Sequence, residues 1–154
     1  MKTTLEELLA SGRLKRHKAS SKELHSLFEI IKRDLADAKI TAISDDRRFT
    51  IAYNAALQAG RALLAAEGYR TAGQGHHATV FQALRHFLPA EYSHLPDYFD
   101  DCRSKRNIAE YTDTEIASHH EVQELASEAH NFAVLMKDLI KKSHPQLANA
   151  IKVT

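Results

Sequence analysis

Two arginines three positions apart are the most chemically suggestive feature of this 154-residue sequence. Residues 103–111 read RSKRNIAEY and continue a helical pattern. Residues three or four apart share a helix face, so Arg103, Arg106, Asn107 and Tyr111 form one polar stripe. Paired guanidinium groups suit phosphate or carboxylate binding, because each donates two parallel hydrogen bonds. The alternative is a solvated face whose arginines pair with neighbouring acidic side chains.

Histidines form a second set of candidates. His76 and His77 precede a predicted helix, where they could cap the helix, bind a ligand or supply an acid–base group. Adjacent histidines on a helix diverge by about 100°, so they seldom hold one metal ion together. The same argument disfavours a metal site at residues 119–121 (HHE). There is no HExxH pattern and no pair of cysteines. The sequence therefore predicts no metal site and no cofactor.

Charge and composition exclude several classes of protein. The net charge is +1, so no overall field draws the chain to nucleic acid or to a membrane. A basic run at residues 13–22 has no interleaved aromatic residues, which favours a solvated connector over an RNA contact. Cys102 is the single cysteine, which fits a reducing compartment, and no apolar run approaches the ~20 residues of a membrane span. We expect a cytoplasmic protein without membrane contact.

The elements that must position these candidates are helices. Apolar residues recur at helical spacing along most of the chain, and strand-like alternation is missing before residues 150–154. A central helix from about residue 47 to 67 carries many small residues, so other helices can approach it closely. Further helices are predicted near residues 5–10, 24–38, 76–88, 97–111 and 115–142.

This pattern predicts an all-α, up-and-down bundle of four to five main helices. Residues 1–20 would hold a short helix and a basic connector, residues 21–142 the bundle, and residues 143–154 a loose tail. Ser20 and Glu23 form a plausible capping box for the first long helix. The run 112–114 (TDT) is expected to cap the last one.

Three segments together resemble the HEPN superfamily of small helical-bundle proteins. Residues 52–68 read AYNAALQAGRALLAAEG, which is similar to the central helix of that family. Residues 75–81 read GHHATVF, similar to the histidine-led helix that follows it. The arginine stripe and its continuation AEYTD supply the third segment. The resemblance spans roughly residues 24–140 and implies a dimeric helical bundle.

The resemblance also implies a chemistry. In active HEPN proteins an arginine followed by a polar residue, with a histidine four to six residues after the arginine, cleaves RNA without a metal ion. Arg106 and Asn107 match the first half of that motif, and Tyr111 stands where the histidine is expected. A phenol with a pKa near 10 is a weak base at neutral pH. Related family members pair with a nucleotidyltransferase as toxin and antitoxin, and that partner modifies a tyrosine, a role that Tyr111 could take here.

Three hypotheses follow from the sequence. The first is a binding or regulatory module in which Arg103, Arg106, His76 and His77 hold a nucleotide or an RNA phosphate. The second is a metal-independent endoribonuclease that uses Arg106, in which a histidine from elsewhere in the fold, above all His76 or His77, replaces the missing one. The third is a helical scaffold without a ligand. Tyr111 in place of histidine favours binding over cleavage.

Overall fold

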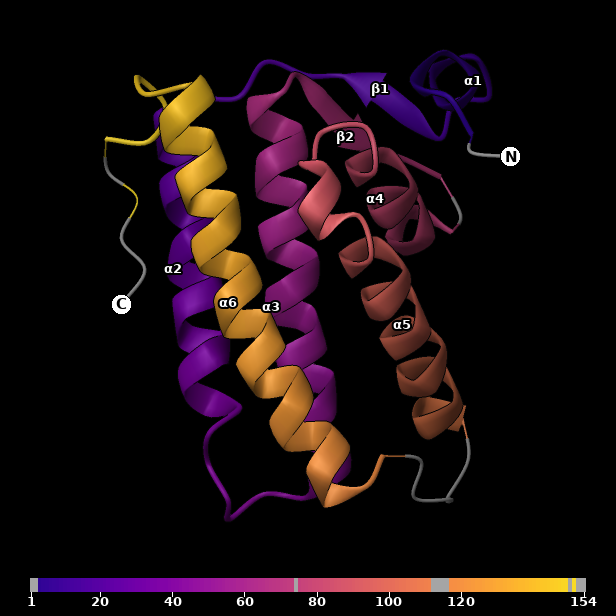
Figure 1. Ribbon diagram of the computed structural model, residues 1–154, viewed down its shortest axis with the longest axis vertical. Coiled ribbons are helices and arrows are strands. Elements are labelled where there is room, and N and C mark those ends of the chain that lie inside the picture. The colour runs from indigo at the N-terminus through magenta and orange to yellow at the C-terminus, as the bar shows by residue number, and fades with distance from the viewer. Residues whose placement is uncertain (1–2, 74, 112–116, 150, 152–154) are drawn as a thin grey trace.

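The computed structural model of the chain describes residues 3–73, 75–111, 117–149 and 151, and the side chains of all of these except residues 108–111. The chain forms a helical bundle with one small strand pair (Figure 1). In chain order the elements are α1 (Leu5–Ala10), β1 (Leu14–Arg16), α2 (Ser21–Asp37), α3 (Asp45–Ala66), β2 (Tyr69–Thr71), α4 (His76–Leu84), the 3₁₀ helix η1 (Ala90–Tyr92), α5 (Leu95–Tyr111) and α6 (His119–Ser143). This architecture confirms the predicted all-α class.

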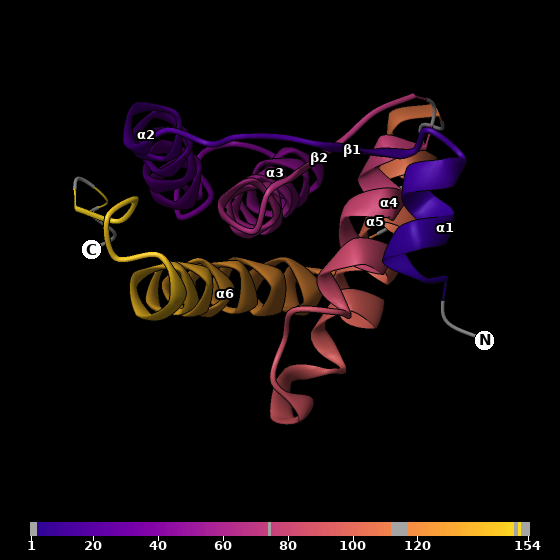
Figure 2. The same ribbon diagram turned by 90° about the horizontal axis from the view of Figure 1, so that it is seen from above.

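The central position of α3 organises the bundle. Helix α3 lies between α2 and α6. Helices α4 and α5 also pack against α3 (Figures 1 and 2). Its small residues Ala52, Ala56, Ala59 and Gly60 are buried, which lets its neighbours approach closely. A Cβ atom added at Gly60 would lie 2.8 Å from Leu84 Cδ1 in α4. The predicted central helix is therefore confirmed.

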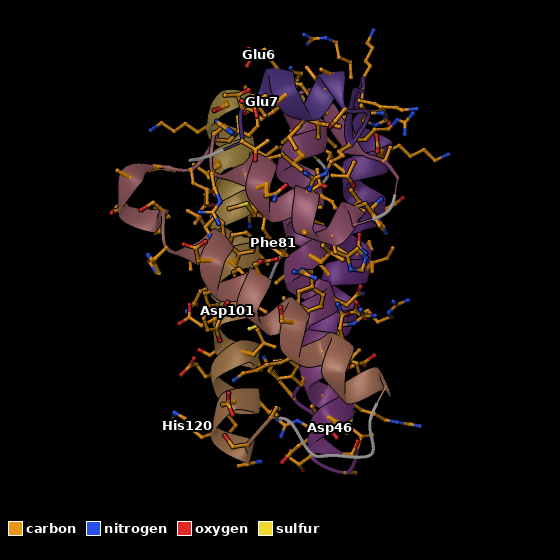
Figure 3. The ribbon with its side chains drawn as sticks, turned by 90° about the vertical axis from the view of Figure 1, so that its right-hand side faces the viewer. Glu6, Glu7, Asp46, Phe81, Asp101 and His120 are labelled. Atoms are coloured by element: carbon orange, nitrogen blue, oxygen red, sulfur yellow. The ribbon has the colours of Figure 1, made fainter. Side chains whose placement is uncertain are left out.

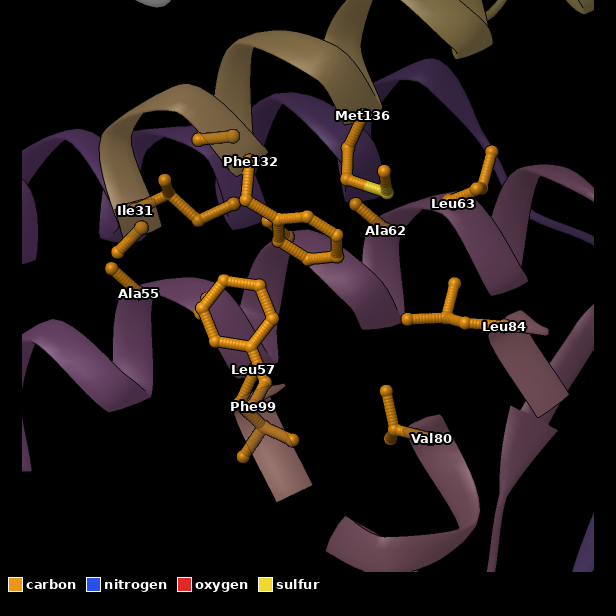
Figure 4. Packing of buried hydrophobic residues seen from close by; sticks show 14 of the residues in the cluster. Ile31, Ala55, Leu57, Ala62, Leu63, Val80, Leu84, Phe99, Phe132 and Met136 are labelled. Atoms are coloured by element: carbon orange, nitrogen blue, oxygen red, sulfur yellow. The ribbon is translucent and has the colours of Figure 1, made fainter. Parts of the chain in front are cut away.

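Aromatic side chains connect the two sides of the bundle. The ring centroids of Phe99 in α5 and Phe132 in α6 lie 4.7 Å apart, and Figure 4 labels both residues. The ring centroid of Phe81 in α4 lies 6.0 Å from that of Phe99. These three rings are almost completely buried. Burial of large aromatic side chains is a strong stabilising contribution, so this chain of rings fixes α4 and α5 against the rest of the bundle.

Helix starts follow the predicted capping chemistry, with one change. The Ser20 side chain accepts a hydrogen bond from the backbone N–H of Glu23, as predicted. The carboxylate of Glu23 does not complete a capping box, because it contacts Nε2 of His17 at 2.8 and 2.9 Å. A complete capping box forms at the start of α6 between Ser118 and Glu121. The sequence predicted the cap of this last helix at residues 112–114, which was wrong, because α6 begins at His119 and is capped by Ser118. Residues 112–114 themselves lie outside the described residues.

The small strand pair was not predicted from the sequence. Strands β1 and β2 are antiparallel, with Leu14 opposite Thr71 and Arg16 opposite Tyr69. Each strand has three residues, too few for an alternating pattern to register in the sequence. The pair joins the basic connector to the segment after α3, and it buries Leu14.

Two helix ends also differ from the prediction. Helix α4 ends at Leu84 rather than near residue 88. After α6, Ala148 and Ile151 are buried against the core, although a loose tail was expected there. None of the helices in the described part of the chain is both long and apolar enough to cross a bilayer.

Candidate functional site

The cationic side chains of α5 are half-buried rather than freely solvated. Arg103 Nε donates a hydrogen bond to Asp100 Oδ1 at 2.8 Å, one turn earlier on the same helix, and the Arg103 side chain is 25% exposed. The interpretation of the stripe as a face of arginine–carboxylate pairs therefore holds for Arg103. Arg106 Nη1 lies 3.4 Å from Oδ1 of Asn107, and both residues are half-buried.

Arg106 and His77 meet at the same aromatic ring. The guanidinium carbon of Arg106 lies 5.7 Å from the centroid of the Tyr53 ring, within the range of a cation–π contact. The His77 ring centroid lies 6.3 Å from that of Tyr53. Tyr53 belongs to α3, His77 to the first turn of α4 and Arg106 to α5. The fold thus brings together two candidates from distant parts of the sequence, on the α4–α5 side that faces the viewer in Figure 3.

His76 lies at the outer edge of this arrangement. Its ring centroid is 4.4 Å from that of His77, and His76 is exposed whereas His77 is half-buried. Gly75 precedes them with a left-handed backbone (φ +71°), which ends the preceding loop and starts α4. Since Gly75 has no side chain to cap the helix, the first backbone N–H groups of α4 lack a side-chain acceptor at this position.

The surroundings keep His77 neutral. Burial and the positive charges around it lower the pKa of His77 from 6.5 to about 4. Burial is the largest cause, and the charges come from His76, Arg106, Arg61 and Arg103. Three arginines from α3 and α5 therefore lie close enough to act on one imidazole. We call Arg103, Arg106 and His77 the arginine–histidine cluster.

Tyr53 is the site residue that sequence reasoning missed. It lies in the alanine-rich part of α3 and is almost fully buried, at 1% exposed. Its hydroxyl oxygen, however, has no hydrogen-bond partner among the described residues. Burial raises the pKa of Tyr53 above its usual value, against the opposing effect of Arg103 and Arg106. The signal available in the sequence was a side chain with a hydroxyl group, that of Tyr53, among the alanines of the central helix.

The remaining sequence candidates lie elsewhere or cannot be placed. Tyr111 ends α5, but its side chain lies outside the described residues. His119 contacts Asp45 at 3.3 Å, near the start of α3. His120, labelled in Figure 3, is exposed at the same end of the molecule. No group of three or more His, Cys, Asp or Glu side chains within the described ranges could hold a metal ion.

Two hollows of the surface have linings that include none of the cluster residues. A cavity of about 330 Å³ lies between α2, α3 and the strand pair, and its lining includes His17, Arg61 and Tyr69. Arg61 is thus shared between this cavity and the electrostatic surroundings of His77. A second cavity, of about 400 Å³, lies between η1 and α6, and its lining includes the carboxylates of Glu91, Glu128 and Asp138 beside apolar side chains. An acidic lining disfavours a phosphate group there.

Comparison with known proteins assigns the family. A family model described as SAV_6107-like HEPN matches residues 39–137, which is well over half of the chain. The match includes α3, α4 and α5, and therefore every residue of the arginine–histidine cluster and Tyr53. Searches of curated proteins and of solved structures return no significant match. Together with the helical architecture, the family match shows that this chain belongs to the HEPN superfamily.

Proposed function

We propose that this HEPN protein is a binding module that holds a phosphate group of RNA or of a nucleotide at the arginine–histidine cluster. The observation that carries the proposal is the meeting of Arg106 and His77 at the Tyr53 ring, with Arg61 and Arg103 close enough to depress the pKa of His77. Several positive charges that converge on one place attract an anion. Half-burial strengthens that attraction, because solvent screens the charges less there.

The chemistry of each group fits a phosphate ligand. The planar guanidinium of Arg106 can donate two parallel hydrogen bonds to phosphate oxygens. A neutral His77 retains one ring N–H as a donor, and a bound anion would favour its protonated form with two donors. Arg103 is partly neutralised by Asp100, so we assign it a supporting electrostatic role.

Arginine substitution tests this proposal. Binding of inorganic phosphate, a nucleoside monophosphate and a short single-stranded RNA would be measured by calorimetry at moderate salt. We expect Arg106→Ala to weaken binding about tenfold or more, as for a charged hydrogen bond. The matched control is Lys141→Ala, which also removes one positive charge but lies exposed in the last turn of α6. Unchanged affinity in a folded Arg106→Ala protein would contradict the proposal, as would a wild type that binds none of the three probes.

A second candidate function is metal-independent RNA cleavage. The neutral imidazole of His77 beside Arg106 favours it, because His77 could take a proton from the ribose 2′-hydroxyl while Arg106 stabilises the anionic phosphorane. RNA would be incubated with the protein in the presence of a chelator. Cleavage that disappears in His77→Ala but persists in Tyr111→Phe would support this function. Binding without cleavage would leave the binding module as the function.

Partners belong to the same proposal. HEPN domains often dimerise, and we propose that this chain forms a homodimer, which light scattering at micromolar concentration would test. We further propose that a nucleotidyltransferase, encoded by a neighbouring gene, regulates this protein by modifying Tyr111. Co-expression with such a partner followed by mass spectrometry would test it, and an unmodified Tyr111 peptide would contradict it.

A further inference from the structure

The Tyr53 hydroxyl has no structural role that the fold explains. The large aromatic side chains that are fully buried in the described part of the chain are Phe28, Phe81, Phe99, Phe132 and Tyr53. Four of these five are phenylalanines, which fill the core without a polar atom. The Tyr53 hydroxyl oxygen is buried and makes no hydrogen bond within the described residues. An unsatisfied buried hydroxyl destabilises a fold, so a phenylalanine would serve packing better at this position.

The surroundings of Tyr53 point toward the arginine–histidine cluster. On one side the Tyr53 ring contacts the fully buried Phe81, which is labelled in Figure 3, with 6.3 Å between the ring centroids. The ring also contacts His77 and Arg106, which are both half-buried and polar. The charges of Arg103, Arg106 and Asp100 all act on the Tyr53 hydroxyl. The Tyr53 hydroxyl, which has no hydrogen-bond partner among the described side chains, thus lies near the positive charges that would attract a phosphate.

We propose that the Tyr53 hydroxyl donates a hydrogen bond to the phosphate group held by the arginine–histidine cluster. This inference rests on the proposed binding function and adds a residue to it. In the structure the Arg106 guanidinium lies over the Tyr53 ring. A phosphate that draws Arg106 to its own oxygens would uncover the hydroxyl and satisfy it. Burial keeps the hydroxyl protonated by raising its pKa, so it meets the anion as a donor.

The test uses Tyr53→Phe, which keeps the ring and removes only the hydroxyl. Affinity for inorganic phosphate and for a short single-stranded RNA would be measured in the full-length protein. We expect Tyr53→Phe to weaken binding of both probes about tenfold, as for a lost hydrogen bond to a charged group, while its thermal midpoint stays equal or rises. Tyr92→Phe in η1 is the matched control, because Tyr92 lines the hollow between η1 and α6, which contains no cluster residue, and the change is chemically identical.

Three outcomes would overturn the inference, and they differ from one another. If wild type binds neither probe, the proposed function fails and the inference fails with it. If wild type binds and Arg106→Ala weakens binding while Tyr53→Phe does not, the inference alone is wrong. If Tyr53→Phe lowers the thermal midpoint together with the affinity, the hydroxyl supports the fold through a buried water rather than through the ligand.

A spectroscopic readout reports on the hydroxyl directly. In protein labelled at the tyrosine ζ carbon, the Tyr53 resonance is identified by its disappearance in Tyr53→Phe. We expect this resonance to shift when phosphate is added to wild type and to stay in place in Arg106→Ala. A Tyr53 resonance that is insensitive to saturating phosphate would contradict the proposed hydrogen bond.

Discussion

The unusual protonation of His77 leads to the most demanding prediction. Its pKa is lowered from 6.5 to about 4 in the fold, so the unfolded chain takes up the proton first as the pH falls. Folding therefore favours the neutral imidazole. The stability that this preference contributes is fully present above pH 6.5 and is lost as the pH falls through that value toward about 4.

The magnitude follows from the shift. At about 1.36 kcal/mol per pKa unit, the change from 6.5 to about 4 corresponds to at most about 3 kcal/mol. His77 is half-buried, so solvent screening reduces this, and we expect a loss of about 1–2 kcal/mol between pH 7.5 and pH 4. The sequence contains nine other histidines, whose contribution the comparison must cancel. The matched comparison is therefore His77→Gln, which keeps a polar side chain but takes up no proton.

The assay combines unfolding and titration. Urea unfolding of wild type and His77→Gln at several pH values would give the difference in free energy of unfolding, and we expect wild type to lose about 1–2 kcal/mol more than the variant on acidification. An NMR titration would follow the His77 ring directly. In Arg106→Ala we expect the pKa of His77 to rise without reaching 6.5, because burial, the larger cause, remains. Parallel pH profiles for the two proteins, or a His77 resonance that titrates near 6.5, would refute the reasoning.

Two further predictions concern the packing that holds the site. Gly60→Ala places a Cβ atom 2.8 Å from Leu84 Cδ1. We expect this clash to outweigh the gain in helix propensity and to lower the free energy of unfolding by about 1 kcal/mol, measured by urea unfolding. A Gly60→Ala/Leu84→Ala double variant should lose less free energy of unfolding than the two single variants added together. Arg48, 4% exposed, donates from Nε to the Ala38 carbonyl at 2.9 Å. Arg48→Met should lower the free energy of unfolding by about 2–3 kcal/mol. The matched control is Arg47→Met, at an exposed position, which should change the free energy of unfolding by less than about 0.5 kcal/mol. Equal effects of the two substitutions would contradict a stabilising role for the buried Arg48 hydrogen bond.

Local signals in the sequence were sufficient for the helices. Ser20 and Ser44 both cap helices as their residue types predict, and each accepts a hydrogen bond from the residue three positions later. The placement of α3 at the centre followed from its alanines and Gly60. The strand pair escaped detection because its stability comes from pairing between residues 14–16 and 69–71, which no local window contains.

The sequence identified only part of the candidate site. Arg103 and Arg106 were identified by their spacing, and His77 by its position before a helix. The sequence left open whether His77 lies near the arginines, and it gave no reason to separate His77 from the adjacent His76. The structure distinguishes them, since His77 packs against Tyr53 and His76 is exposed.

The amino-acid sequence by itself determined the helical class, the apolar faces and the presence of an arginine pair, because these depend on residues within a few turns of one another. Only the tertiary structure decided which polar groups meet. Packing of α4 and α5 on α3 brings His77 and Arg106 to one ring and lowers the pKa of the imidazole. It also leaves the Tyr53 hydroxyl without a hydrogen-bond partner among the residues that the structure describes. These properties arise from burial and from charges on separate helices, which exist only once the chain has folded.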